Sequence, residues 1–380
     1  MERVFDLASF AQAVSSTDPI PTVLRHAPSA RLRRSTSPVH NDALFGPDIQ
    51  RLSHADWDNG IRSEVQSFLL PGGILVPNSM AVLSRELELQ PWSVANIGDP
   101  RNLTTYDPNF GISASGALCM TEMFHACLKQ DSRTAMPICG PGLWNYGHFL
   151  FDSLPAIFLL NALMPASPFY ICGPQLRPFQ IEILTLLGLA DRYVVVDQPT
   201  SFSKLIGTTM QSLHVAYPSK FIRTAFDALS YAAPSSQGGA AKVYISRGDD
   251  TKRLMVNREE IELLVSDMGY DVIRPAEMSV IAQMERLLSA CVIVGEAGAG
   301  MANIGFAEPG AKILEILPFN DAWIRNSCEL LGHNWHCFLP RLQNRVTSDV
   351  AGLNQHVYHI DKAELKAAIE VIESKNATGL

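Results

Sequence analysis

The chain has 380 residues, of which 47% are hydrophobic and 18% are charged. This composition supplies enough apolar material for sizeable cores and excludes a disordered or fibrous chain, and the length favours two domains over one. The formal net charge of -8 argues against a general nucleic-acid binder, because binding to duplex phosphates requires a basic face.

Residues 1–65 carry scattered Pro and Ser with weak periodicity, which predicts only a covering layer on the first domain. The basic tract Arg31, Arg33 and Arg34 leaves two alternatives open: a solvated loop, or a contact for a polyanionic acceptor or an anionic membrane surface. The start lacks the basic and apolar regions of a secretory signal, and the seven cysteines form no CxxC pair. We therefore expect a cytoplasmic protein with no disulfide framework and no metal site.

The next segment alternates apolar runs with chain breaks. Strands are predicted over residues 74–77 and 117–120, and Gly140-Pro-Gly142 interrupts the chain before a helix predicted over residues 145–163. The most apolar stretch, residues 149–164, is too short to cross about 30 Å of hydrocarbon. We expect a buried helix there and no transmembrane segment.

A strand over residues 169–172, a helix over residues 179–187 and a strand over residues 193–196 follow, which is typical of parallel βαβ units. Residues 232–241, AAPSSQGGAA, predict a linker, because small residues with Pro and paired Gly cannot build a core. We therefore expect domains over residues 1–235 and 236–380.

The second domain has the clearest pattern. Asn257, with Glu260 three residues later, predicts the start of a helix that ends at Gly269, and Ser279 predicts the start of the next. Strands are predicted in four apolar runs: residues 243–246, 272–273, 291–294 and 312–317. This is half of a doubly wound α/β sheet, whose ligands should lie beyond the carboxyl ends of the strands. A last amphipathic helix is predicted over residues 361–374.

A glycine loop follows the third of these strands and opens a short helix. Gly295, Gly298 and Gly300 let the main chain approach an anion closely, with backbone N–H groups directed at phosphate. The alternative is a tight turn without a ligand, since the spacing is GxxGxG and not the dinucleotide pattern GxGxxG. Glu315, twenty residues past Gly295, would accept hydrogen bonds from ribose hydroxyls, or else is an ordinary charged residue at a strand end.

Charged residues elsewhere support two further hypotheses. Arg247, Lys252 and Arg253 follow a strand and would neutralise a diphosphate, unless they form a solvated surface cluster. The i to i+4 spacing places His148 and Asp152 on one helix face, where they would act as a general base, unless His148 is a structural histidine. The neighbouring Asn145 and Tyr146 would line the acceptor side of the cleft, or else cap the helix and lie at the edge of the core.

Three ordered segments over roughly residues 138–320 resemble glycosyltransferase family 61. GPGLWNYGHFLFDSLPAIFLL is similar to the family's N-Y-x-H-W-x-x-D-x-L-P segment. VYISRGDDTKRLMVNREEIELL is similar to its Y-I-S-R-x-x-x-x-x-R-x-x-x-N stretch, and VIVGEAGAGMANIGFAEPGAKILEILP to its V-I-x-x-x-H-G-A-G-L-x-N segment. Two positions depart from the pattern, because Ala297 replaces the family histidine and Phe149 replaces a tryptophan.

The resemblance implies an α/β enzyme of GT-B type, with two Rossmann-like domains facing a central cleft. The first domain would bind the acceptor and the second a nucleotide sugar, with a terminal helix that crosses back. The family implies an inverting hexosyl- or pentosyltransferase that acts on a glycan or another hydroxyl acceptor in polysaccharide biosynthesis, with a UDP-linked donor as co-substrate and no other cofactor or obligatory metal.

An inverting displacement needs a base beside the acceptor and positive groups beside the diphosphate. His148 would be the base, with Asp152 as its orienter or as the base itself. The two arginines and the amides of Gly298, Ala299 and Gly300 would hold the diphosphate, and Asn303 and Glu315 the ribose or the sugar. Glu296 would lie in the cleft, in contact with hydroxyls or a cation.

Two alternatives remain at the level of sequence. A nicotinamide or flavin oxidoreductase is supported by the glycine loop and the acidic residue twenty positions later, and it is weakened by the glycine spacing. A degenerate member of the family that binds glycan or nucleotide without turnover is supported by Ala297.

Overall fold

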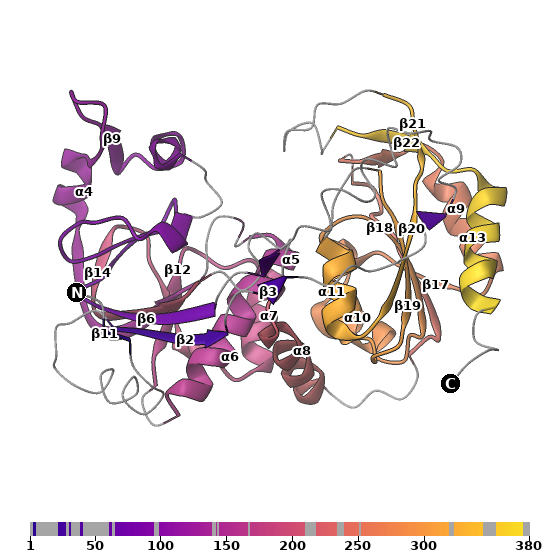
Figure 1. Ribbon diagram of the computed structural model, residues 1–380, viewed down its shortest axis with the longest axis horizontal. Coiled ribbons are helices and arrows are strands. Elements are labelled where there is room, and N and C mark those ends of the chain that lie inside the picture. The colour runs from indigo at the N-terminus through magenta and orange to yellow at the C-terminus, as the bar shows by residue number, and fades with distance from the viewer. Residues whose placement is uncertain are drawn as a thin grey trace. The chain divides into compact units, whose positions relative to one another are not determined.

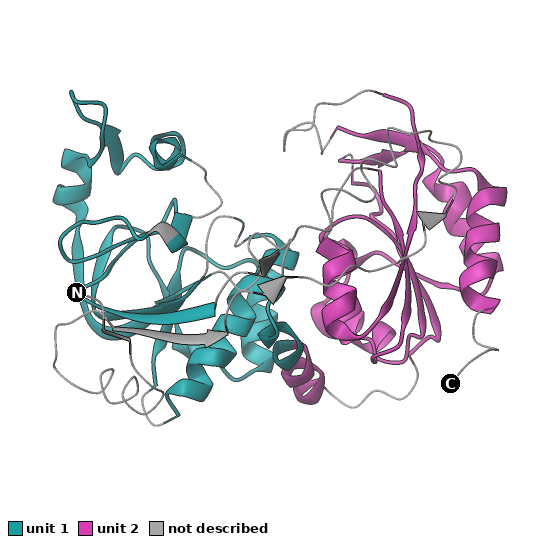
Figure 2. Cartoon of the chain, viewed as in Figure 1, with its two compact units in different colours: residues 1–30, 62–215, 219–225 teal, residues 31–61, 216–218, 226–380 magenta. Residues whose placement is uncertain are grey.

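The computed structural model describes residues 65–94, 99–138, 142, 144–165, 168–209, 218–233, 239–250, 252–318, 323–344 and 355–374, with the backbone of five short strands nearer the N-terminus (Figure 1). The chain divides into two compact units (Figure 2). The first unit comprises residues 1–30, 62–215 and 219–225, and the second comprises residues 31–61, 216–218 and 226–380. The boundary near residue 235 stays a prediction. The residues outside the described part of the chain include Arg33, Arg34, Gly140-Pro141 and residues 234–238 of the linker expected over 232–241.

The first unit contains a mixed sheet of nine described strands. Strands β14, β11, β12 and β13 are parallel and adjacent in that order, whereas β6 is antiparallel to β14 and to β2. The strands are β1 (Arg3–Val4), β2 (Thr22–Ala27), β6 (Val65–Pro71), β7 (Ile74–Val76), β8 (Ala81–Leu83), β11 (Lys129–Pro137), β12 (Tyr170–Gly173), β13 (Tyr193–Val195) and β14 (Thr200–Thr208). The parallel βαβ units predicted for this region are confirmed.

Short elements cover this sheet and extend the unit. They are η2 (Pro91–Val94), η3 (Pro100–Asn102), α3 (Leu103–Tyr106), the hairpin of β9 (Phe110–Ile112) and β10 (Leu118–Met120), α4 (Glu122–Cys127), α7 (Pro178–Leu186) and η5 (Ala190–Arg192). The helix α8 (Phe221–Ala232) begins in the first unit and ends in the second. A buried apolar cluster joins β7 and β8 to α3, β9 and α4, and it includes Val76, Leu83, Leu103, Phe110 and Phe124. This cluster gives the unit a core separate from that of the second unit.

The helix predicted over residues 145–163 is present, but it contains a π turn. α5 (Tyr146–His148) continues into the π-helical turn η4 (Phe149–Ser153) and then into α6 (Leu154–Leu163). The amide of Leu154 donates to the carbonyl of Phe149, five residues earlier. Pro155 causes the deviation, because it lacks an N–H group and its ring would clash with the carbonyl four residues before it in a regular α-helix.

The second unit contains a sheet of six described strands, all parallel, in the order β17-β15-β18-β19-β20-β4. They are β15 (Lys242–Ile245), β17 (Asp271–Ile273), β18 (Val292–Glu296), β19 (Lys312–Ile316), β20 (Asn334–Phe338) and β4 (Val39–His40). The predicted doubly wound sheet is confirmed. The covering layer predicted for residues 1–65 is wrong where it is described, because β2 and β4 are strands of the two sheets and β4 belongs to the second unit.

Helices cover both faces of this sheet, with α9 and α13 on one side and α10 and α11 on the other (Figure 1). The helices are α9 (Arg258–Asp267), η6 (Pro275–Glu277), α10 (Val280–Leu287), η7 (Ala299–Phe306), α11 (Trp323–Leu331) and α13 (Lys362–Ser374). Residues of α9, α13 and four strands of this sheet share one buried core, so the terminal helix packs within its own unit. A small sheet of β16 (Leu254–Met255), β22 (Val357–His359) and β21 (Arg341–Leu342) completes the unit, and short β3 (Ala30–Arg31) and β5 (Ile61–Arg62) pair separately.

The predicted helix ends can be compared directly with the structure. Gly269 ends α9 at φ +84°, and the Ser279 hydroxyl accepts a hydrogen bond from the Ala282 amide, so both are confirmed. The helix start predicted at Asn257 is confirmed, because α9 begins at Arg258, but the Asn257 side chain makes no capping hydrogen bond. Its side chain instead makes two hydrogen bonds, at 2.8 and 3.1 Å, to the main chain of Ile360, which ties the start of α9 to the segment before α13. No helix within the described residues is long and apolar enough to cross a bilayer.

Candidate functional site

The sheet of the second unit has its topological switch point between β15 and β18. The next strand of this sheet after β15 in the chain, β17, lies on one side of β15, whereas β18, β19 and β20 lie on the other. In doubly wound sheets, ligands bind outside the carboxyl ends of the strands at this point. β15 ends just before Arg247 and β18 ends just before the glycine loop, so two segments predicted to bind a donor leave the sheet side by side.

Two arginines lie against the glycine loop. Nη1 of Arg247 and Nη1 of Arg253 donate to the carbonyl oxygen of Ala297, at 3.2 and 3.1 Å. A Cβ atom built on Gly298 would lie 2.0 Å from Nη1 of Arg247, so only glycine allows this guanidinium to lie on the loop. Nε of Arg247 is buried and has no hydrogen-bond partner among the described residues. The structure therefore brings together three of the residues predicted to hold a diphosphate.

Asp250 and Lys252 complete the charged loop between the two arginines. The Asp250 carboxylate forms an ion pair with Nη2 of Arg247 and accepts a hydrogen bond from the Lys252 amide at 2.9 Å. The Lys252 side chain is exposed. Asp250 therefore offsets part of the positive charge and also shapes the turn that carries it.

The helix after the glycine loop, η7, is a 3-10 helix, and it begins at Ala299. Asn303 does not point out of it. Its Nδ2 donates to Oε1 of Gln283 at 2.7 Å and to the Gly300 carbonyl at 3.0 Å, and the residue is fully buried. This amide joins η7 to α10, so its role in the structure is to hold the loop.

Glu315 also lies inside the second unit. It is 2% exposed, in the interior strand β19, and its Oε2 accepts a hydrogen bond from Nε1 of Trp335 at 2.9 Å. Its charge, together with burial, raises the pKa of the thiols of Cys328 and Cys337, with burial the larger cause. The predicted ribose contact and the glycine loop are therefore not brought to one solvent-accessible surface in this structure.

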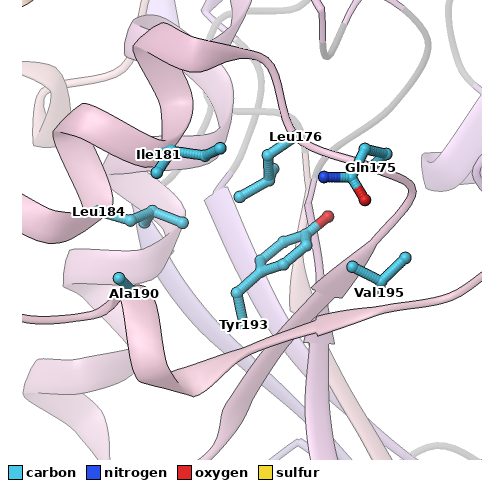
Figure 3. Close-up of a pocket in the computed structure, with 7 residues that line it drawn as sticks. All are labelled: Gln175, Leu176, Ile181, Leu184, Ala190, Tyr193 and Val195. Carbon is cyan, nitrogen blue, oxygen red and sulfur yellow. The ribbon is translucent and has the colours of Figure 1, made fainter.

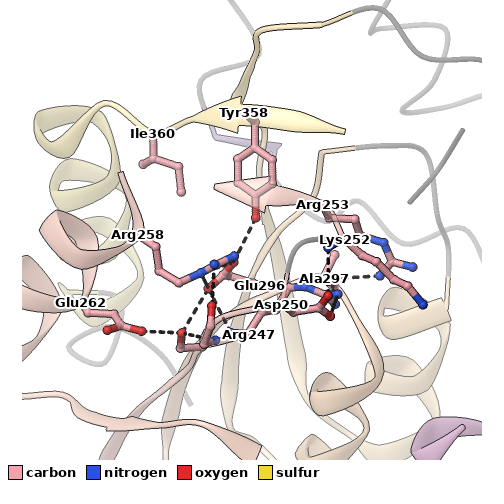
Figure 4. Close-up of polar contacts among 12 residues, drawn as sticks. Arg247, Asp250, Lys252, Arg253, Arg258, Glu262, Glu296, Ala297, Tyr358 and Ile360 are labelled. Carbon is pink, nitrogen blue, oxygen red and sulfur yellow. Dashed lines mark hydrogen bonds and ion pairs between the residues drawn. The ribbon is translucent and has the colours of Figure 1, made fainter. Parts of the chain in front are cut away.

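Glu296 is the centre of a buried polar network at the end of β18 (Figure 4). Its carboxylate forms an ion pair with Arg258, with Nη2 to Oε2 at 2.9 Å and Nε to Oε1 at 3.1 Å. The Tyr358 hydroxyl donates to Oε2 at 3.1 Å, and the Arg247 amide donates to Oε1 at 3.1 Å. The cation expected beside Glu296 is thus supplied by the protein itself, and removal of one partner from such a buried pair typically costs about 3–5 kcal/mol.

The protonation of this network follows from its contacts. Burial lowers the pKa of Arg258, but the hydrogen bond and charge of Glu296 outweigh burial and raise it overall. Burial, reinforced by the charge of Glu296, raises the pKa of Tyr358 well above its usual range, so Tyr358 stays a neutral donor. Burial alone would raise the pKa of Glu262, but hydrogen bonds from Arg274 and Ser246 lower it below its usual 4.5. Arg258 and Glu262 are therefore charged at neutral pH, whereas Tyr358 is neutral.

Sequence reasoning did not find Arg258 or Tyr358. The available signal was Glu296 itself, a carboxylate in an otherwise apolar buried strand, which requires a cation nearby. The sequence did not identify that cation, because several arginines follow β15.

The first unit holds the other predicted site, where β11 ends between its parallel neighbours β12 and β14. Nδ1 of His148 lies 3.3 Å from Oδ2 of Asp152, and the side chains are 13% and 2% exposed. Gly142, at φ +102°, lies over the imidazole, since a Cβ there would approach Cδ2 of His148 to 3.0 Å. The predicted contact within one helix is therefore present, with Asp152 in the π turn, where the widened backbone marks many functional sites.

The residues before His148 fix the start of its helix. The Asn145 side chain accepts hydrogen bonds from the amides of Gly147 and His148, at 2.9 and 3.4 Å, and so caps α5. The ring of Tyr146 packs edge-on against Phe179, with centroids 5.4 Å apart, and burial raises the pKa of its hydroxyl. Trp144 is 42% exposed, and its Nε1 lies 3.4 Å from the Gln175 carbonyl.

A pocket of about 190 Å³ lies between α7 and β13 in the first unit (Figure 3). Its lining is Gln175, Leu176, Ile181, Leu184, Ala190, Tyr193 and Val195. The only phenol there, Tyr193, donates to the Pro174 carbonyl at 2.6 Å, and burial raises its pKa. No described residue of this lining is charged, so the pocket offers no group for acid, base or anion chemistry at neutral pH.

The parallel sheets and the basic loop at a switch point are those of a Rossmann-like α/β protein. Residues 146–314 match the family model Glycosyltransferase 61, which confirms the resemblance seen in the sequence. This match implies a glycosyltransferase with a sugar donor and an acceptor. The matched segment includes the His148–Asp152 pair, both arginines and the glycine loop. No curated protein matches the chain.

Proposed function

We propose that this protein is an inverting glycosyltransferase of GT-B type that transfers a hexose or pentose from a UDP-sugar to a hydroxyl of a glycan. The observation that carries the proposal is the pair of guanidinium groups, Arg247 and Arg253, on the Gly298 loop at the switch point. Arginine binds diphosphate oxygens through parallel N–H groups, and the buried Nε of Arg247 would gain an acceptor. The exposed Lys252 adds a third positive charge to the same loop.

The donor contacts proposed are Arg247, Arg253, Lys252 and the amides of residues 298–300. We leave Asn303 and Glu315 out of this set, because both side chains are buried and hydrogen-bonded in the core of the unit. The diphosphate gains negative charge as it leaves the sugar, and these cations would stabilise that charge without a metal ion.

In the first unit, His148 is the proposed general base, oriented by Asp152. A neutral imidazole whose second nitrogen is held by a carboxylate can take the proton of the attacking hydroxyl through its other nitrogen. In a GT-B arrangement this base would face the donor across the cleft. The acceptor would then be a glycan made in the cytoplasm in polysaccharide or capsule biosynthesis. The protein itself would make peripheral contact with a membrane through the basic tract at Arg31.

The proposal is tested by binding and by turnover. UDP titrated calorimetrically into the full chain should bind, and Arg253→Gln should weaken it by about 10-fold or more, the usual loss for a hydrogen bond to a charged group. Release of UDP from a panel of UDP-sugars with glycan acceptors should then depend on His148. Equal UDP affinity in wild type and Arg253→Gln would reject the donor site.

A second function is favoured by one observation, the alanine at position 297 where the family has histidine. A protein that binds donor and acceptor without transfer would keep UDP affinity and its dependence on Arg253, but it would release no UDP from any sugar donor. Replacement of Ala297 by histidine separates the two, since only a degenerate protein would gain turnover from the restored side chain.

A further inference from the structure

The Arg247 loop is held in two ways by consecutive residues at the end of β18. The Ala297 carbonyl accepts a hydrogen bond from the Arg247 guanidinium, and the Glu296 carboxylate accepts one from the Arg247 amide. One residue therefore fixes the side chain and its neighbour fixes the main chain. The position of the guanidinium on Gly298 depends on both contacts.

The same network holds the next residue, Gly248. Nη1 of Arg258 donates to the Gly248 carbonyl at 2.5 Å, and the Ser246 hydroxyl accepts a hydrogen bond from the Gly248 amide at 3.0 Å. Gly248 has φ +56°, a left-handed conformation in which a turn is fixed by its hydrogen bonds rather than by its side chain. Three main-chain groups of the loop, the Arg247 amide and the amide and carbonyl of Gly248, are thus bound to the side chains of Glu296, Ser246 and Arg258.

We propose that Arg258 and Glu296 are positioning residues of the anion site: their buried ion pair, with Ser246, sets the main chain at residues 247–248 and so keeps the Arg247 guanidinium on the Gly298 loop. This inference rests on the proposed donor site. Neither Glu296 nor Arg258 contacts the ligand, because Glu296 is 1% exposed and the carboxylate and guanidinium are paired with each other.

Positioning and simple electrostatics predict opposite results for Glu296→Gln. This change removes one negative charge next to the loop, so charge alone would tighten the binding of an anion. Positioning predicts weaker binding, because the amide cannot hold Arg258 and the Arg247 main chain together as the carboxylate does. The neutral double variant Glu296→Gln with Arg258→Gln sharpens the contrast, since charge alone predicts wild-type affinity and positioning predicts a loss.

The experiment is a calorimetric titration of inorganic pyrophosphate into the full chain at fixed ionic strength. We expect Glu296→Gln and the double variant each to weaken the binding of pyrophosphate by about 10-fold or more. This is the usual loss when a hydrogen bond to a charged group can no longer form. Equal or tighter binding by Glu296→Gln overturns the inference. If Glu296→Gln does not fold, Ser246→Ala serves instead, because it frees the Gly248 amide without any change of charge, and unchanged affinity in that variant overturns the inference equally.

Two controls separate this inference from stability and from the donor site. Lys312→Met breaks a buried contact far from the loop, where Nζ donates to the Ile372 carbonyl at 2.5 Å, so it should lower the melting temperature and keep pyrophosphate affinity. A parallel loss of affinity in Lys312→Met would assign the effect to stability and overturn positioning.

The second control is Arg253→Gln. If Arg253→Gln weakens the binding of pyrophosphate and Glu296→Gln does not, only the inference fails. If wild type does not bind pyrophosphate, both the proposed donor site and this inference are rejected.

Discussion

Gly298→Ala tests the geometry of the anion site with the smallest possible change. The added Cβ would lie 2.0 Å from Nη1 of Arg247 and 3.4 Å from Nη1 of Arg253. Contacts under about 3 Å between such atoms are not tolerated, so the Arg247 guanidinium must leave the loop and lose its 3.2 Å hydrogen bond to the Ala297 carbonyl. A charged hydrogen bond contributes about 1.5–3 kcal/mol, which corresponds to about a 10- to 150-fold loss of UDP affinity.

The assay is calorimetric titration of UDP, with melting temperature measured alongside. Gly300→Ala is the matched control, because the nearest atoms to a Cβ there belong to the side chains of Pro275 at 3.3 Å and Ile245 at 3.4 Å and not to either arginine. We expect a much smaller loss of UDP affinity in Gly300→Ala than in Gly298→Ala. Wild-type affinity in a folded Gly298→Ala protein would refute the placement of Arg247 at the diphosphate.

Three further predictions concern the other charged residues. His148→Ala and Asp152→Asn should keep UDP affinity while the rate of sugar transfer falls about 100- to 10,000-fold, as expected for a lost general base; wild-type rates on a working donor and acceptor pair would make the pair structural. Glu315→Leu should lower the free energy of unfolding by about 1–3 kcal/mol, measured in urea, because it removes the hydrogen bond from Nε1 of Trp335, and UDP affinity should be unchanged; a loss of affinity would return Glu315 to the donor site. The pKa of Glu262 is lowered below 4.5 in the folded protein, so its contribution to stability is present above that pH and is lost as the pH falls through the folded pKa. Urea midpoints of wild type should therefore fall more between about pH 6 and about pH 3 than those of Glu262→Gln, and parallel pH dependences would contradict this.

The sequence by itself determined those parts of the second unit that local chemistry controls. Gly269 ends α9 and Ser279 caps α10 because each acts on main-chain groups within a few residues. The alternation of apolar strands and amphipathic helices specified a parallel sheet, and with it a ligand edge at the carboxyl ends. His148 and Asp152 could be paired from their spacing alone, since residues four apart share a helix face.

The sequence pattern did not predict the long strands of the first unit that contain polar residues. β11, KQDSRTAMP, has exposed polar positions in its first half and lies inside the sheet only because β12 and β14 pair with it. Its neighbours come from 33 or more residues later in the chain, which no local pattern encodes. The addition of β4 to the second sheet is a pairing of the same kind, across nearly three hundred residues.

The roles of the acidic residues were decided only by tertiary structure. Glu296 and Glu315 both end apolar strands in the sequence, and a carboxylate in that position suits either a ligand or an internal cation. Burial selects between these uses, because a charge removed from water must find a partner inside the protein. Arg258 reaches Glu296 across 38 residues, Tyr358 across 62, and Trp335 reaches Glu315 across 20, and it is these three distant partners that make both carboxylates part of the core.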